Sequence, residues 1–218
     1  MAEDVDPNKL EIADELIAER RSASPGELPD DMNSAHRAII GFIDTFNEYV
    51  GKIVCWMLVP LCIAMVYEVV ARKVGLDPSV WFGRGEIIPK PTVWAFDVSR
   101  MLYGAMFMLG AAYALARGVH IRADFIYRNW SDRTQGIIDL ILYCTLFMFG
   151  MAGLMYSGFE YFLSSLSPRW EVANDTAWAP YLWPIRLCIP LGAAFLMLQG
   201  ISEILKSWYA ATRGRWPV

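Results

Sequence analysis

Four long runs without a charged residue constrain this chain more than any other feature of its sequence. The runs are Ile53–Tyr67, Met101–Ala116, Leu140–Phe159 and Leu187–Ser202. A bilayer core about 30 Å thick requires roughly 20 mostly apolar residues, and each run reaches that length once its interfacial ends are included. Backbone groups in lipid must satisfy their own hydrogen bonds, so each run should be helical. The sequence therefore predicts an all-α integral membrane protein with four transmembrane helices.

The expected organisation is a membrane domain between two tails. We place the membrane domain at residues 36–210, and residues 211–218 form a short cytoplasmic tail. The spans are expected near residues 52–70, 94–116, 137–163 and 183–205. Cys55, Cys62, Cys144 and Cys188 all fall inside these spans without CxxC spacing, which favours a packing role over disulfides or metal binding.

Residues 1–35 are expected to form an acidic cytoplasmic tail. Residues 1–31 hold ten Asp or Glu against three Lys or Arg, a net charge of −7. This charge disfavours contact with nucleic acid or with an anionic membrane surface. A short amphipathic helix is the alternative to a solvated tail, because Leu10, Ala13, Leu16 and Ile17 share one helical face. The tail holds no apolar core of signal-peptide length, so we expect the first span to act as its own insertion signal.

The distribution of Lys and Arg predicts that both termini are cytoplasmic. With the N-terminus inside, nine cationic residues flank the spans on the inner side and seven on the outer side. The short loop between the second and third spans carries four Arg and is the most one-sided segment. Cytoplasmic loops are enriched in Lys and Arg, so these counts set the orientation.

The charge-free runs argue against a transport path or an active site inside this chain. A path for a charged solute leaves ionisable residues at membrane depth, whereas these runs offer only Gln199 and scattered hydroxyls and thiols. We therefore expect a non-enzymatic protein without a cofactor. The alternative is a haem- or quinone-associated anchor of a redox enzyme, since bis-His ligation suits a four-helix anchor. His36 and His120 lie outside the charge-free runs, which disfavours that alternative.

Several spacings predict contacts between helices. Glu68 with Arg72, and Asp97 with Arg100, stand four and three residues apart and can pair on one helix face. Small residues recur every four positions in the second span and again in the third, where they suit close approach of the chain's own helices or of a partner helix. Pro60 and Pro190 should bend or loosen their spans, and Gly192 follows the second proline. The small residues are Gly110, Ala114, Gly118, Gly153 and Ser157.

The second span and the loop after it resemble the small permease subunit, or Q subunit, of tripartite ATP-independent periplasmic (TRAP) transporters. The resemblance rests on Trp94, Asp97 and Arg100, on Gly110 to Ala114, and on the Gly118-Val119-His120-Ile121-Arg122-Ala123-Asp124 segment. The family usually has Glu where this chain has Asp97. A second block resembles the family's last span: it comprises Trp178, Pro180, Trp183, Pro184, Pro190-Leu191-Gly192, Gln199 and Glu203.

The resemblance implies a DctQ-like subunit of a three-component importer in the bacterial inner membrane. A periplasmic substrate-binding protein (P subunit) would deliver an organic acid to a large permease subunit (M subunit). The small subunit would brace the large one, within membrane lipid, during symport driven by an ion gradient, with sodium as the expected ion. The candidate subunit-interface residues are Trp94, Asp97, Arg100, Gly110, Ala114, Gly118, His120, Arg122 and Asp124, with Pro60, Pro190 and Gly192 as structural candidates.

Overall fold

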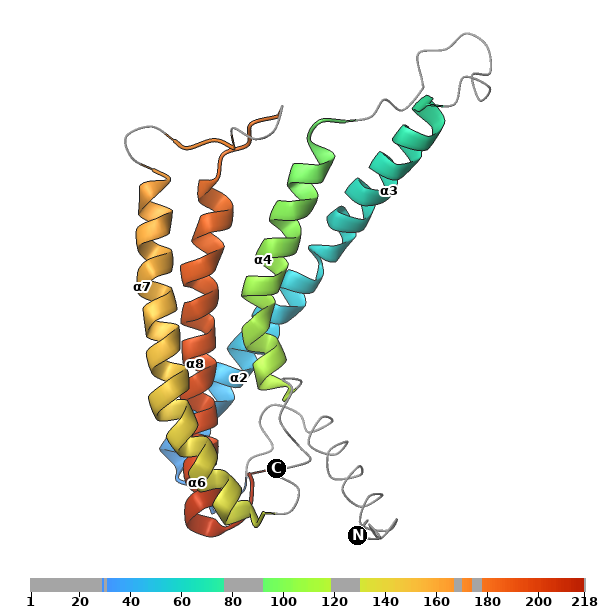
Figure 1. The fold of residues 1–218 in the computed structure, drawn as a ribbon. Coiled ribbons are helices and arrows are strands. Elements are labelled where there is room, and N and C mark those ends of the chain that lie inside the picture. Colours follow the sequence, from blue (N-terminus) through green and yellow to red (C-terminus); the bar gives the residue numbers. More distant parts are fainter. Residues whose placement is uncertain are drawn as a thin grey trace, which may run out of the picture. The chain divides into compact units, whose positions relative to one another are not determined.

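The computed structural model is helical almost throughout the part of the chain that it describes (Figure 1). Described are Pro29 and the ranges 31–76, 92–118, 130–166, 170–173 and 178–217. The helices are α2 (Ser34–Cys55), α3 (Leu58–Leu76), α4 (Ala95–Ala116), α6 (Asp132–Leu142), the π-helix η2 (Tyr143–Phe147), α7 (Met148–Ser164) and α8 (Trp183–Arg213). The acidic tail up to residue 28, the loop of residues 77–91, and His120, Arg122 and Asp124 lie outside the described residues.

Four stretches of the described residues are long and apolar enough to cross a membrane. They are Ser34–Lys73, Ala95–Ala116, Asp132–Ser164 and Trp183–Arg213. This number agrees with the four spans predicted from the charge-free runs. The first stretch begins 18 residues before the predicted span at 52, because the Asn33 side chain caps the Ala35 N–H at 3.2 Å and helix α2 starts there.

The first stretch is interrupted near Pro60. Helix α2 ends at Cys55 and α3 starts at Leu58. Between them the Trp56, Met57 and Val59 N–H groups bond to carbonyls three residues back, at 3.0–3.2 Å, instead of four. Pro60 has no N–H to offer the Trp56 carbonyl, and its ring crowds that carbonyl, so the chain tightens locally.

The third stretch joins α6, η2 and α7. Ser131 begins it as an N-cap whose side chain accepts the Thr134 N–H. The five residues Tyr143–Phe147 then widen into a π-turn, where the Thr145 hydroxyl also donates to the Ile141 carbonyl at 2.6 Å. Such a widening accommodates one extra residue within an otherwise α-helical segment.

The chain divides into two compact units. One contains the described residues of Met1–Glu48, Ala112–Gly150 and Leu196–Val218, and the other those of Tyr49–Ala111 and Met151–Phe195. The first unit thus gathers the start of α2, the end of α4, the start of the third stretch and the end of α8.

Helix α8 is the most buried of the four stretches, and it stays helical through Pro190. In the first unit it packs against α6, where the Ala211 backbone nitrogen lies only 2.7 Å from the point that a Gly136 Cβ would occupy. In the second unit it runs beside α7, with Ile189 and Pro190 against Gly158 (Figure 1). Glycines therefore mark the positions where neighbouring helices come closest to α8.

Candidate functional site

The beginning of α4 is fixed to α3 by one carboxylate. Glu68 Oε2 accepts the Thr92 N–H at 2.9 Å and the Thr92 hydroxyl at 2.7 Å, and the Arg72 Nε donates to Oε1 at 2.7 Å. The Thr92 hydroxyl in turn accepts the Ala95 N–H at 3.2 Å, in the manner of a helix cap. The contact between Glu68 and Arg72 confirms the ion pair predicted from their spacing.

Trp94 directly precedes α4, and Asp97 and Arg100 lie in its first two turns. The Trp94 ring stacks on Tyr67 of α3, with centroids 6.5 Å apart. Asp97 is 1% exposed, and Arg100 Nη2 lies 3.8 Å from its Oδ1, which confirms the second predicted ion pair. Within the described part of the chain neither oxygen of Asp97 accepts a hydrogen bond. The positive end of the α4 dipole helps to stabilise this buried carboxylate.

The small residues of α4 differ in what they do. A Cβ on Gly110 would lie 3.8 Å from Val54 of α2, an ordinary contact distance. Gly118 adopts φ 62° directly after α4, and its N–H bonds to the Leu115 carbonyl at 3.0 Å, so this glycine ends the helix. Ala114 is half-buried. These three positions do not form a continuous close contact within the described chain.

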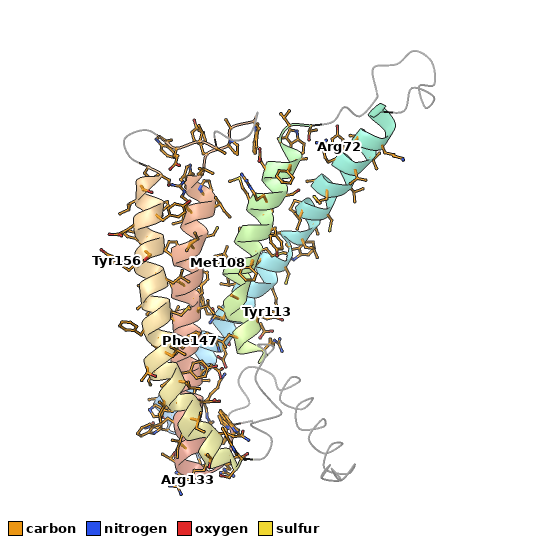
Figure 2. All side chains as sticks on the ribbon, viewed as in Figure 1. Arg72, Met108, Tyr113, Arg133, Phe147 and Tyr156 are labelled. Atoms are coloured by element: carbon orange, nitrogen blue, oxygen red, sulfur yellow. The ribbon has the colours of Figure 1, made fainter. Side chains whose placement is uncertain are left out.

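The closest contact between α4 and α8 lies at Gly192 instead. A Cβ there would fall 2.6 Å from the backbone oxygen of Met108 and 2.9 Å from its carbonyl carbon. Met108 lies on α4 where it meets α8 (Figure 2). A second contact lies one turn before Met108 on α4 and two turns before Gly192 on α8. There a Cβ on Gly104 would lie 3.1 Å from the Ile185 Cδ1 atom. Gly192, singled out in the sequence only for following Pro190, thus sets the separation of these helices.

Sequence reasoning missed a polar network between α2 and α8 in the first unit. Asp44 accepts hydrogen bonds from Gln199 Nε2 at 2.9 Å and from the Ser202 hydroxyl at 2.7 Å. Lys206 Nζ lies 2.8 Å from Asp44 and 3.0 Å from Glu203. The Asn47 amide donates to Gln199 Oε1 at 2.8 Å, and both of these side chains are buried.

The available signal for this network was the pattern of α2 itself. Its exposed large side chains are apolar and recur every three or four residues, whereas Asp44 and Asn47 lie on the opposite face. The exposed set is Ile39, Phe42, Phe46, Tyr49 and Ile53, and Trp56, just after α2, continues it. A helix with its polar face inward and its apolar face outward suits an apolar environment, so the charge of Asp44 did not mark the edge of the helix.

A second buried cation organises the segment before α8. Arg186 donates to both oxygens of Glu171, at 2.6 and 2.8 Å, and its guanidinium lies 4.0 Å from the centroid of the Tyr161 ring. Val172 and Tyr181 form an isolated antiparallel bridge in the same segment. Bidentate pairing and ring stacking use the planar shape of the guanidinium. Arg186 therefore ties the end of α7 and the following segment to the start of α8.

Asp31, just before α2, connects the N-terminal part of the first unit to the C-terminal end of α8. It accepts a hydrogen bond from the Tyr209 hydroxyl at 2.7 Å and pairs with Arg215. The Tyr209 hydroxyl first, and then the Arg215 guanidinium, hold the pKa of the Asp31 carboxyl below its ordinary value.

A metal ion or a haem requires ligating side chains that lie close together. No group of three or more His, Cys, Asp or Glu side chains has a metal-binding arrangement there. His36 lies in the first turn of α2, whereas His120 falls outside the described residues. No observation in this part of the chain therefore favours the redox-anchor alternative.

Comparison with known proteins gives one match. A family model described as "Tripartite ATP-independent periplasmic transporters, DctQ component" matches residues 61–209, which is more than half of the chain. No curated protein and no solved structure matches this sequence. The matched range includes α4, the third stretch and most of α8, together with all the candidate interface residues.

Proposed function

Because the chain belongs to the family of DctQ components of TRAP transporters, as the small membrane subunit of such a transporter, we propose that it braces the large permease subunit during solute uptake. The solute is an organic acid that a periplasmic binding protein delivers, and an ion gradient, with sodium as the ion, drives its import. The four-helix bundle serves as a fixed support against which the transport domain of the large subunit moves.

The observation that carries this proposal is how the chain uses its buried charges. Glu68 joins α3 to the start of α4 through Thr92, Arg186 pairs with Glu171, and Lys206 pairs with Asp44, so each of these contacts holds two segments of this chain together. Charges that are paired within the chain in this way hold a rigid bundle together. A solute path instead requires ionisable groups that remain available to the solute. This pattern supports a bracing role, with the solute and ion sites in the large subunit.

The proposed orientation has both termini in the cytoplasm of a bacterial cell and the bundle in its inner membrane. The first unit, with Arg117, Arg133, Lys206, Arg213 and Arg215, then lies on the cytoplasmic side. Arg186 and Glu171 then lie on the periplasmic side, where the binding protein docks.

The start of α4 is the proposed contact region for the assembly as a whole, together with the loop that holds His120, Arg122 and Asp124. Arg100 is suited to this role because its side chain is 49% exposed, whereas Asp97 is covered by the chain itself and positions Arg100 through their ion pair. Charge reversal at Asp97 or Arg100 should reduce the amount of large subunit recovered with the tagged chain. Unchanged recovery with both variants would remove these residues from the interface.

The decisive experiment reconstitutes uptake from purified components. The tagged chain is purified from its native membrane in mild detergent, its stoichiometric partners are identified, and an absorbance spectrum is recorded. The complex is then placed in proteoliposomes with the binding protein, an organic acid and a sodium gradient. We expect a large polytopic permease at one to one, no haem absorbance, and uptake that requires the small subunit. A soluble redox partner with bound haem would refute the proposal.

A further inference from the structure

One charged side chain of α7 points away from the bundle. Glu160 is exposed, although it lies within Asp132–Ser164, one of the stretches that can cross a membrane. Its carboxylate accepts a hydrogen bond from the Tyr156 hydroxyl at 2.8 Å. Helix α7 ends at Ser164, and Tyr156 lies one turn before Glu160. The hydrogen bond therefore directs the carboxylate back along the helix, away from its C-terminal end.

The face of α7 that carries Glu160 is opposite the face that meets α8. Gly158 contacts Ile189 and Pro190 of α8. At about 100° per residue, Glu160 and Tyr156 lie about 160° around the helix from Gly158, and Gly153 lies about 140° from it. Tyr156 is 66% exposed and projects from α7 on the side away from α8 (Figure 2).

This outward face is also open to close approach. No atom of the described chain lies within 4 Å of the position that a Gly153 Cβ would take, and Ser157, one turn along, is exposed. The small residues Gly153 and Ser157 were predicted to allow a helix to approach closely, and the chain's own helices leave Gly153 uncovered. Small residues that alternate with polar ones are typical of helix interfaces in membranes.

Lipid is a poor neighbour for this face. A carboxylate that faces lipid is costly, and a short Glu side chain held by Tyr156 reaches the interface less easily than Lys or Arg does. A cationic side chain on a neighbouring helix would neutralise the carboxylate in place. The open space at Gly153 suits the close approach of a transmembrane helix, and the charge of Glu160 suits a cationic residue on that helix.

We propose that the α7 face made by Gly153, Tyr156, Ser157 and Glu160 binds a transmembrane helix of the large permease subunit, which places a Lys or Arg opposite Glu160. This inference rests on the proposed function, because it takes the large subunit as the partner. It adds a second contact surface to the one proposed at the start of α4.

Photo-cross-linking in native membranes tests the contact directly. Tyr156 is replaced by the photoreactive residue benzoylphenylalanine in the tagged full-length chain, which is expressed with the whole transporter. The matched control carries the same replacement at Tyr49 of α2, which is 67% exposed against 66% for Tyr156. We expect ultraviolet light to give a product from Tyr156 with the combined mass of the small and large subunits, well above the yield from Tyr49.

Two cross-linking results would overturn the inference. A product with the mass of two small subunits would assign the face to a second copy of this chain. The absence of any protein product, while the large subunit still co-purifies at one to one, would assign it to lipid and would leave the proposed function intact. Absence of the large subunit from the preparation of the unmodified chain would instead refute the proposed function, and this inference with it.

Charge substitution tests the cationic partner. We expect E160K to reduce the recovered large subunit on the order of tenfold or more, and E160Q to reduce it less, because the amide keeps an acceptor for Tyr156 but loses the charge. Arg133→Glu, an exposed charge reversal in the first turn of α6, is the control and should leave recovery unchanged. Equal recovery with E160K and the control would contradict a cationic residue opposite Glu160.

Discussion

Gly192 shows at the residue scale how this bundle is built. Its missing side chain lets the backbone of α8 reach the Met108 carbonyl of α4, and no flexible group stands between them that could move aside. In a membrane, where lipid is as apolar as the helices, such close packing is a main source of helix association.

We predict that Gly192→Ala destabilises the bundle by about 1–3 kcal/mol, because a methyl group there overlaps the Met108 backbone and forces the two helices apart. The measurement is thermal unfolding of the purified complex in detergent. Gly110→Ala is the matched control and should be neutral or slightly stabilising, by up to about 1 kcal/mol, since alanine favours the helix and the site has room. Equal melting temperatures for the two variants would contradict the role of Gly192.

Asp31 gives a prediction for pH. Because contact with Tyr209 and Arg215 lowers its pKa in the folded chain, the ionised form stabilises the fold. This contribution is fully present above the ordinary carboxyl pKa near 4 and disappears as the pH falls through the lower folded value. Asp31→Asn should therefore melt below the unmodified chain at pH 7, and the two melting temperatures should converge below about pH 4. A constant difference across this range would argue against Asp31 as the source.

Local spacing predicted some of these residue contacts and could not predict others. Glu68 with Arg72 and Asp97 with Arg100 are neighbours on one helix, so their spacing was enough. The contact between Gly192 and Met108 joins helices far apart in sequence, and its register depends on how they pack. Within the described chain the tighter glycine contacts of α4 are at Gly104 and at Met108 against Gly192, and the approach of a partner helix at Gly110, Ala114 and Gly118 stays a prediction.

At the scale of the element, α2 departs most from its prediction. A span was expected to start where charges end, near residue 52, yet the helix begins at Ser34 and its Asp44 pairs with Lys206 of α8. The polar network thereby fixes the register of α2 on α8, because each amide, hydroxyl and charge has a specific partner. Composition along one helix cannot reveal such pairing, since the partners Lys206 and Gln199 come more than 150 residues later.

Removal of one member tests this network. Asp44→Ala should destabilise the fold by about 2–3 kcal/mol, because Lys206, Gln199 and Ser202 all lose an acceptor that water replaces poorly. Thermal unfolding of the purified subunit provides the measurement. Thr45→Ala, at the exposed neighbouring position, controls for the change in helix propensity and should alter the melting temperature little. A similar loss in both variants would show that the network adds no stability.

At the scale of the whole molecule, the number of spans followed from hydropathy alone. Lipid imposes a length and a backbone rule that hold for any sequence, so four apolar runs predicted four helical stretches. The division into two units did not follow from the sequence, because it arises from contacts between the ends of different helices. The family was also indicated by short motifs around α4 and α8, and the match over residues 61–209 confirms it.

The orientation of the whole molecule can be tested by labelling. Trp178→Cys places a thiol before the start of α8, and Arg213→Cys places one at its last residue, at the opposite end. With both termini cytoplasmic, a membrane-impermeant thiol reagent should label the Trp178→Cys variant in cells with a permeable outer membrane, and the Arg213→Cys variant only after the inner membrane is opened. The native cysteines lie in the spans, so the unmodified chain gives the background. The reverse pattern would invert the proposed topology.

The central position of α8 has a consequence for how the protein is made. The ribosome delivers α2, α3, α4 and α7 to the membrane before α8, yet α8 supplies the contacts that join α2, α4, α6 and α7. The first three spans therefore enter the bilayer with only the contacts that they make among themselves, such as Glu68 with Thr92, and gain those to α8 when synthesis is nearly complete. Chains that terminate early would lack their organising helix and remain open to membrane proteases, so only complete subunits reach assembly.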